Sequence, residues 1–185
     1  MAEPTVKELV SQDERISVRW RSFELRPEPV PTLDPDGDYL LSAWQNHVYP
    51  LAAKMNMPLT RPPIQPRSRL AHEAAKWADG QGCFDEYHLA LFRAFFEHGK
   101  DIGDIEILKG LAADLNHDAK SLQISFKNGD YTEIVLVDQH EAAQVGVRAV
   151  PAFVVNGKVE AAGVQTAGRL HEILFRNFSS GGPHS

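Results

Sequence analysis

Residues 146–163 read Gly-Val-Arg-Ala-Val-Pro-Ala-Phe-Val-Val-Asn-Gly-Lys-Val-Glu-Ala-Ala-Gly and carry the strongest turn signal in the chain. The apolar run at 153–155 is too short and too β-branched for a helix, which predicts a strand. Asn156 and Gly157 follow it, and this pair favours a two-residue type I′ turn because both residues take positive φ. We therefore expect two antiparallel strands, with Pro151 at the first position, where its missing N–H breaks no ladder.

The composition limits the class of protein. A chain of 185 residues with 43% hydrophobic content is long enough for one domain, with room for an inserted subdomain. The 25 acidic and 19 basic residues give a net charge of −6, and there is no basic cluster, so we expect no nucleic-acid binding. No apolar run approaches the ~20 residues of a membrane-spanning helix, and the first residues are unlike a signal peptide. These features predict a cytoplasmic protein without a membrane anchor.

Cys83 is the only cysteine of the sequence. It cannot form an internal disulfide, a Cys-x-x-Cys redox pair or a multi-cysteine metal site. Cys83 lies near the start of a predicted helix, whose amides favour a thiolate, so a reactive thiol is one hypothesis and a structural role is the favoured alternative. The run from His72 to Lys76 comes within one residue of the zinc-protease pattern His-Glu-x-x-His, but lysine stands in place of the second ligand. We therefore predict no metal site.

Hydrophobic periodicity assigns the remaining elements. Strict alternation in residues 16–25, from Ile16 onward, predicts a further strand. Asp130 and Glu133 have the spacing of a capping box, and Pro50 is expected to kink or break the helix that contains it. Helical spacing predicts helices in residues 3–12, 38–55, 68–80, 84–99, 104–112, 118–128, 130–146 and 166–178.

Seven segments of the chain carry a family resemblance: 20–27 (Trp-Arg-Ser-Phe-Glu-Leu-Arg-Pro), 71–72 (Ala-His), 91–96 (Leu-Phe-Arg-Ala-Phe-Phe), 146–147 (Gly-Val), 150–153 (Val-Pro-Ala-Phe), 156–158 (Asn-Gly-Lys) and 163–165 (Gly-Val-Gln). With these segments, the order of elements resembles the DsbA-like branch of the thioredoxin superfamily, especially its cytosolic FrnE-type members. The resemblance implies an α/β fold, a thioredoxin-like fold with an inserted helical subdomain. It places residues 1–37 and 130–178 in the thioredoxin-like domain and residues 38–129 in the helical subdomain, and residues 179–185 are expected to form a disordered tail.

The resemblance also implies a site. Pro151 would be a cis proline opposite the catalytic cysteines, and Ala149, Val150 and Pro151 would bind an extended peptide or glutathione through the backbone. Family members begin with a strand and a Cys-x-x-Cys, or with one Cys or Ser in isomerases and kappa-class glutathione transferases, and nothing in this sequence matches that position. The first strand is therefore expected to be missing. Three explanations are open: a fragment of a longer chain, a closed-up three-stranded sheet, or a strand supplied by a partner.

These observations predict a protein of thiol–disulfide oxidoreductase lineage without dithiol redox activity, and they assign no catalytic residue. One alternative is a non-catalytic protein that binds peptides or ligands and forms a homodimer. Another is a relative of glutathione-dependent isomerases or kappa-class glutathione transferases. No cofactor is predicted. Glutathione is a possible substrate of the protein, and is not counted as a cofactor.

Overall fold

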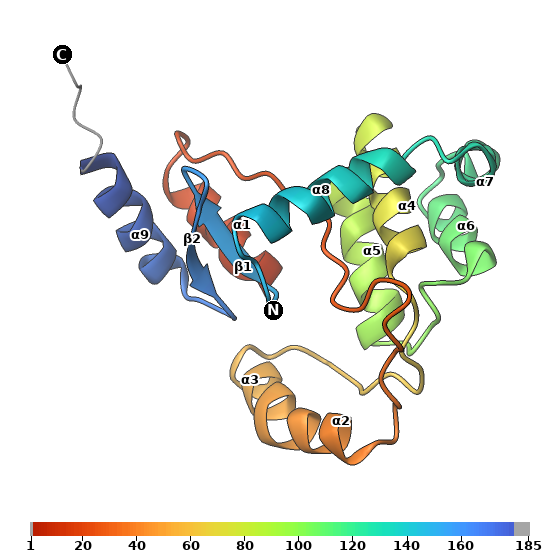
Figure 1. Ribbon diagram of the computed structural model, residues 1–185, viewed down its shortest axis with the longest axis horizontal. Coiled ribbons are helices and arrows are strands. Elements are labelled where there is room, and N and C mark those ends of the chain that lie inside the picture. The colour runs from red at the N-terminus through yellow and green to blue at the C-terminus, as the bar shows by residue number, and fades with distance from the viewer. Residues whose placement is uncertain (1, 180–185) are drawn as a thin grey trace. The chain divides into compact units, whose positions relative to one another are not determined.

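The structure is a computed structural model that describes residues 2–179, with side chains to residue 176 (Figure 1). Of the predicted tail, Ser179 ends the last helix, and residues 180–185 lie outside the described residues. In chain order the elements are α1 (Ala2–Gln12), α2 (Asp38–Ala43), the π-helix η1 (Trp44–Val48), α3 (Tyr49–Lys54), α4 (Arg69–Gly80), α5 (Phe84–Phe96), α6 (Ile105–Asp114), α7 (Ala119–Asn128), α8 (Thr132–Gln144), β1 (Ala152–Val155), β2 (Lys158–Ala162) and α9 (Ala167–Ser179).

The chain divides into two compact units. Among the described residues, the first unit contains residues 2–21 and 140–179, and the second contains residues 22–139. The division passes through α8, whose last residues belong to the first unit. The sequence prediction placed residues 22–37 and 130–139 in the thioredoxin-like domain, whereas their contacts group them with the helical block.

The first unit is built on the predicted hairpin. Val155 pairs with Lys158, which leaves Asn156 (φ 51°) and Gly157 (φ 74°) as the two turn residues and confirms the type I′ prediction. A bulge in β2 interrupts the register next to Phe153. α1 packs against α9, and the apolar faces of these helices and of the hairpin meet in one cluster. The buried members of this cluster are Leu9, Ala167, Leu170 and Ile173.

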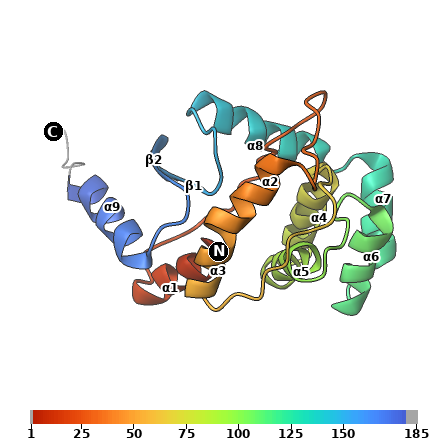
Figure 2. The same ribbon diagram turned by 90° about the horizontal axis from the view of Figure 1, so that it is seen from below.

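The second unit is a helical block, as predicted. Helices α4 to α7 gather around one apolar core. Figure 2 shows these four helices from a second direction. The buried core residues are Ala71, Ala74, Trp77, Ala78, Cys83, Tyr87, Leu91, Ala94, Leu108, Leu111, Ala112 and Leu122. The polar atoms of two large core side chains are satisfied: the Tyr87 hydroxyl donates to the Leu108 carbonyl at 2.8 Å, and the Trp77 indole N–H donates to the Ser121 hydroxyl at 3.2 Å.

The predicted helix caps are confirmed in part. The Asp104 and Asp118 carboxylates accept backbone N–H groups at the starts of α6 and α7, and the Thr166 hydroxyl does so at α9. Ser68 stands at the N-cap of α4, but its side chain makes no capping bond. The capping box at Asp130 is wrong, because α8 begins at Thr132. The Asp130 amide instead donates to Ser125 and so completes the C-terminal end of α7.

Residues 38–54 form α2, η1 and α3 in direct succession. Pro50 lacks the N–H that an α-helical bond to residue 46 would need. The preceding turn widens accordingly, and the Tyr49 amide reaches the Trp44 carbonyl in the i→i+5 pattern of a π-helix. The predicted interruption at Pro50 is therefore present, but as a π-helical turn.

The predicted strand in residues 16–25 is wrong, because in the described part of the chain this segment belongs to no β ladder. Side chains of α8 bind its backbone instead. The Ser22 amide donates to Asp138 at 2.8 Å, and the Glu24 amide donates to the Gln139 side-chain oxygen at 2.7 Å. The Gln139 amide group in turn donates to the Glu24 carbonyl at 3.1 Å. The closed three-stranded sheet is wrong as well, since the described sheet has only β1 and β2.

Candidate functional site

The loop from Ala149 to Pro151 leads directly into β1. α8 ends just before it, where the Val147 amide donates to the Ala142 carbonyl at 2.9 Å. At the other end of the loop the Pro151 carbonyl accepts the Gly163 amide at 2.8 Å, which fixes the loop to the end of β2. The peptide bond between Val150 and Pro151 is cis. Local hydrogen bonds thus hold both ends of the loop.

The backbone between these fixed ends is open to a ligand. Ala149 is exposed, and 44% of the surface of Val150 is exposed. Within residues 2–179, no hydrogen bond engages the amide or carbonyl of either residue. Unpaired backbone groups of this kind can add an extended peptide as a further strand. The three residues predicted as substrate-binding therefore form one accessible segment.

Cys83 lies in the second unit, at the N-cap of α5. It is only 6% exposed and belongs to the apolar core. Burial raises the pKa of its thiol, and the nearby Glu86 carboxylate raises it further. A buried thiol with a raised pKa is a poor nucleophile, because the thiolate is the reactive form. These features favour the structural role of Cys83 over the reactive one.

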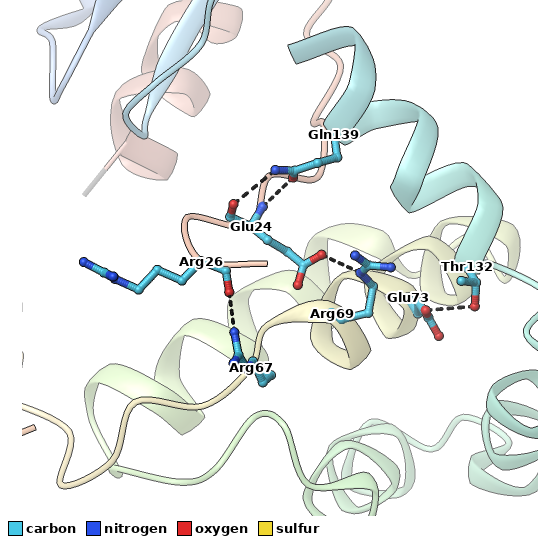
Figure 3. A network of polar contacts seen from close by, with 7 residues as sticks. All are labelled: Glu24, Arg26, Arg67, Arg69, Glu73, Thr132 and Gln139. Atoms are coloured by element: carbon cyan, nitrogen blue, oxygen red, sulfur yellow. Dashed lines mark hydrogen bonds and ion pairs between the residues drawn. The ribbon is translucent and has the colours of Figure 1, made fainter. Parts of the chain in front are cut away.

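A network of buried and partly buried polar groups joins α4, α8 and the segment before the first proline-rich loop, and Figure 3 shows part of it. We call it the α4–α8 network. The Arg69 guanidinium pairs with the Glu24 carboxylate at 2.5 Å, and the Thr132 hydroxyl donates to Glu73 at 2.9 Å. The network contains Glu24, Arg69, His72, Glu73, Lys76, Thr132, Asp138 and Gln139.

Asp138 is the most deeply buried charge of the network. It is 1% exposed and accepts the Lys76 ammonium at 2.6 Å as well as the Ser22 amide. Two donors with charge or partial charge compensate a carboxylate that has lost its water. Lys76 is itself mostly buried, so each ion depends on the other.

His72 occupies the same face of α4. Burial lowers the pKa of its ring, against the opposing effects of the Glu24 carboxylate and of a hydrogen bond to the backbone of Phe23. The positive charges of Lys76 and Arg69 lower the pKa further. His72 therefore acts as a neutral packing group near neutral pH. In the described part of the chain, no group of three or more His, Cys, Asp or Glu side chains is placed to hold a metal ion.

One local pattern pointed to this network, the approach to His-Glu-x-x-His in α4. His72, Glu73 and Lys76 of that pattern do belong to the network, but they act there as ion-pair and hydrogen-bond partners. Asp138 and Gln139 are more than sixty residues further along the chain, and both lie in a segment that periodicity describes only as a helix. No local pattern identifies them.

The family model of the DSBA-like thioredoxin domain matches residues 1–175. The chain belongs to this family. The protein YwbO of Bacillus subtilis, which is uncharacterised, is 32% identical to this chain over 151 residues, or 78% of this chain and 74% of YwbO. This family membership confirms the resemblance seen in the sequence.

Two solved structures share the fold of this chain. A probable DsbA oxidoreductase from Streptomyces coelicolor matches with a TM-score of 0.79 and 20% identity, over 100% of this chain and 86% of the other. A protein from Nitrosomonas europaea, provisionally described as a protein disulfide isomerase, matches with a TM-score of 0.72 and 16% identity, over 97% and 90% of the two chains. At these identities the likeness concerns the fold alone, and it confirms the predicted DsbA-like thioredoxin fold.

Proposed function

We propose that this DsbA-family chain binds extended thiol-bearing peptides, glutathione included, at Ala149, Val150 and Pro151 and runs no dithiol redox cycle of its own. The observation that supports the binding site is the exposed backbone of Ala149 and Val150, which carries no hydrogen bond within the described residues. Backbone pairing suits a protein that takes many sequences, because every peptide offers the same N–H and carbonyl groups.

The chemistry of the single cysteine supports the second half of the proposal. A dithiol cycle needs an accessible thiolate and a second thiol that resolves the mixed disulfide. Cys83 is buried, its pKa is raised, and the sequence holds no second cysteine. The chain therefore keeps the family's fold and offers a place for a thiol substrate, without a redox pair.

An insulin assay tests the absence of redox activity. We expect the 185-residue chain to reduce insulin disulfides with dithiothreitol no faster than buffer, and Cys83→Ala to behave identically. If the chain accelerates the reaction and Cys83→Ala abolishes the acceleration, Cys83 is a working redox centre and the proposal is wrong.

Calorimetry tests the binding site. A short blocked peptide with a central cysteine should release heat with the wild type and with Val150→Ala, which keeps the backbone amide. Val150→Pro removes that amide, and we expect it to weaken binding about tenfold, the loss of roughly one good hydrogen bond. Equal affinities for the three proteins would exclude backbone pairing at Val150.

Glutathione serves as the second ligand in the same titration. Binding of glutathione in preference to the blocked peptide would favour the alternative reading, a relative of the glutathione-dependent isomerases and transferases. A non-catalytic binding protein that forms a homodimer is the other alternative. Sedimentation equilibrium distinguishes it, because the proposed peptide-binding function does not require a dimer.

The proposal includes a cytoplasmic place of action, where thiols remain reduced. Among residues 2–179, no helix has both the length and the apolar character needed to cross a membrane. Fractionation of cells that express the natural gene would test the location.

A further inference from the structure

The hairpin turn carries a reactive pair of residues. Asn156 and Gly157 are both exposed at the tip between β1 and β2. In an Asn-Gly pair the backbone nitrogen of the glycine can reach the side-chain carbonyl of the asparagine easily, because glycine has no side chain to block the approach. The sequence contains a second pair of this kind, Asn128 and Gly129, at the end of α7. The two pairs share their local chemistry and differ in their surroundings.

The turn leaves the two groups that would react without hydrogen bonds. Within residues 2–179 the Gly157 amide donates no hydrogen bond, and the Asn156 side chain forms none either. A β-carbon built on Gly157 would meet no atom within 4 Å, so the space around this residue is open. The Asn156 side chain can therefore turn toward the Gly157 nitrogen without breaking a hydrogen bond.

The pair at the end of α7 is held. Asn128 is the last residue of that helix, and the Gly129 amide donates to the Phe126 carbonyl at 3.3 Å as part of the helix cap. The next amide, that of Asp130, donates to the Ser125 carbonyl at 3.1 Å. Attack by the Gly129 nitrogen requires this cap to open first, and the free energy of opening slows the reaction.

We propose that Asn156 is a site of spontaneous deamidation in the folded protein and that Asn128 is protected. The Gly157 nitrogen forms a bond to the side-chain carbonyl carbon of Asn156 and loses its proton to solvent. The bond from that carbon to the side-chain nitrogen breaks, and the nitrogen takes up a proton and leaves as ammonia. Water then adds to either carbonyl of the cyclic imide and opens the ring, which gives aspartate or isoaspartate without any oxidant or reductant.

The two products have different consequences for the hairpin. Aspartate keeps the turn, because Asp-Gly is also a favoured type I′ pair, and adds only a negative charge. Isoaspartate routes the main chain through the former side chain and so adds one carbon to a two-residue turn. The pairing of Val155 with Lys158 then no longer closes on the turn that defines its register. We expect isoaspartate to loosen β1 and β2. This inference is independent of the proposed function.

Incubation of the wild-type chain near neutral pH, followed by mass spectrometry, tests the proposal. Trypsin separates the two pairs, because Asn156 lies in the peptide 149–158 and Asn128 in the peptide 128–148. In the folded chain we expect Asn156 to react at least about tenfold faster than Asn128, and no more than about thirtyfold slower than it does in guanidinium chloride. In guanidinium chloride the two asparagines should react within about threefold of each other, since the structure that separates them is lost.

A variant separates the effect of charge from that of the longer backbone. Asn156→Asp reproduces the aspartate product, and the isoaspartate form of the wild type is isolated by anion exchange after incubation. Amide exchange of Val155, which lies next to the turn, is the measurement. We expect freshly prepared Asn156→Asp to stay within about threefold of wild type, and the isoaspartate form to exchange at least about tenfold faster, because the closing hydrogen bond is weakened.

Three outcomes overturn the inference. Equal rates at Asn128 and Asn156 in the folded chain would show that the helix cap gives no protection. A rate at Asn156 that falls more than about thirtyfold on folding would show that the turn itself blocks the attack. An isoaspartate form with the same exchange at Val155 as wild type would show that the hairpin accommodates the longer turn.

Discussion

The Asp138 carboxylate holds a backbone amide and a lysine at once. We expect Asp138→Ala to destabilise the protein by about 3 kcal/mol, because Lys76 would remain mostly buried without its counter-ion. The measurement is urea denaturation. Glu133→Gln on the exposed side of the same helix is the control, and it should shift the free energy of unfolding by no more than about 0.5 kcal/mol. A loss for Asp138→Ala as small as that of the control would contradict the role assigned to the ion pair.

His72 should make stability depend on pH. Its pKa in the folded protein is lowered by burial, so the unfolded chain binds the proton more readily. Stability from this group is complete above the ordinary histidine pKa of about 6.5 and decreases as the pH falls below it. We expect His72→Gln to lose less stability than wild type between neutral pH and pH about 5.

Thermal unfolding at several pH values measures this effect. His47→Gln, the same substitution at an exposed histidine of η1, is the control. The groups that face His72 are Glu24, Arg69 and Lys76, together with the Phe23 backbone. Identical pH profiles for wild type and His72→Gln would show that His72 is not the group that titrates.

At the scale of elements, the hairpin depends on its turn. Gly157 has a φ of 74°, a conformation that costs a residue with a side chain about 1–2 kcal/mol. We expect Gly157→Ala to destabilise by this amount in thermal unfolding. Gly168 in α9 has an open environment and is the matched control: Gly168→Ala should be neutral or stabilise by up to about 1 kcal/mol. Equal effects of Gly157→Ala and Gly168→Ala on thermal stability would contradict the role assigned to the positive φ of Gly157.

Turns and caps were predictable because their chemistry is local. The positive φ of Asn156 and Gly157, or the carboxylate of Asp118 at the start of α7, depends on residues within a few positions. The strand expected in residues 16–25 shows the limit. Alternation records that a segment has two faces, but a ladder also needs a neighbouring strand, and the described sheet supplies none for this segment.

The functional residues also fall into two groups, those that sequence could suggest and those that it could not. Residues 149–151 could be proposed as a binding site from sequence, because a proline at the mouth of a strand and a family resemblance both point to them. The α4–α8 network could not, because the burial of Glu24 and Asp138 depends on helix packing between distant parts of the chain. Isolated charges are normally exposed, and only a tertiary partner offsets the free-energy cost of burying them.

For the whole molecule, each unit has its own apolar core. Leu170 is buried in the core of the first unit and Leu122 in that of the second. We expect Leu170→Ala, which costs about 3 kcal/mol, to lower amide protection in α1, the hairpin and α9 more than in α4 to α7. Leu122→Ala should do the reverse. Native-state hydrogen exchange separates the two cases, and equal loss of protection everywhere would mean that the units unfold as one.

The hydrogen bonds from the backbone amides of Ser22 and Glu24 to side chains of α8 also determine which substitutions each position tolerates. At Ser22 the group that is held is the main-chain amide, which nineteen of the twenty amino acids possess. Small residues can therefore replace one another at this position over evolutionary time, whereas proline is barred there and at Glu24. Asp138 and Gln139 make these hydrogen bonds through their side chains, so the identity of the amino acid matters there. For these bonds, relatives should therefore vary less at the side-chain partners than at the residues that contribute only a backbone amide.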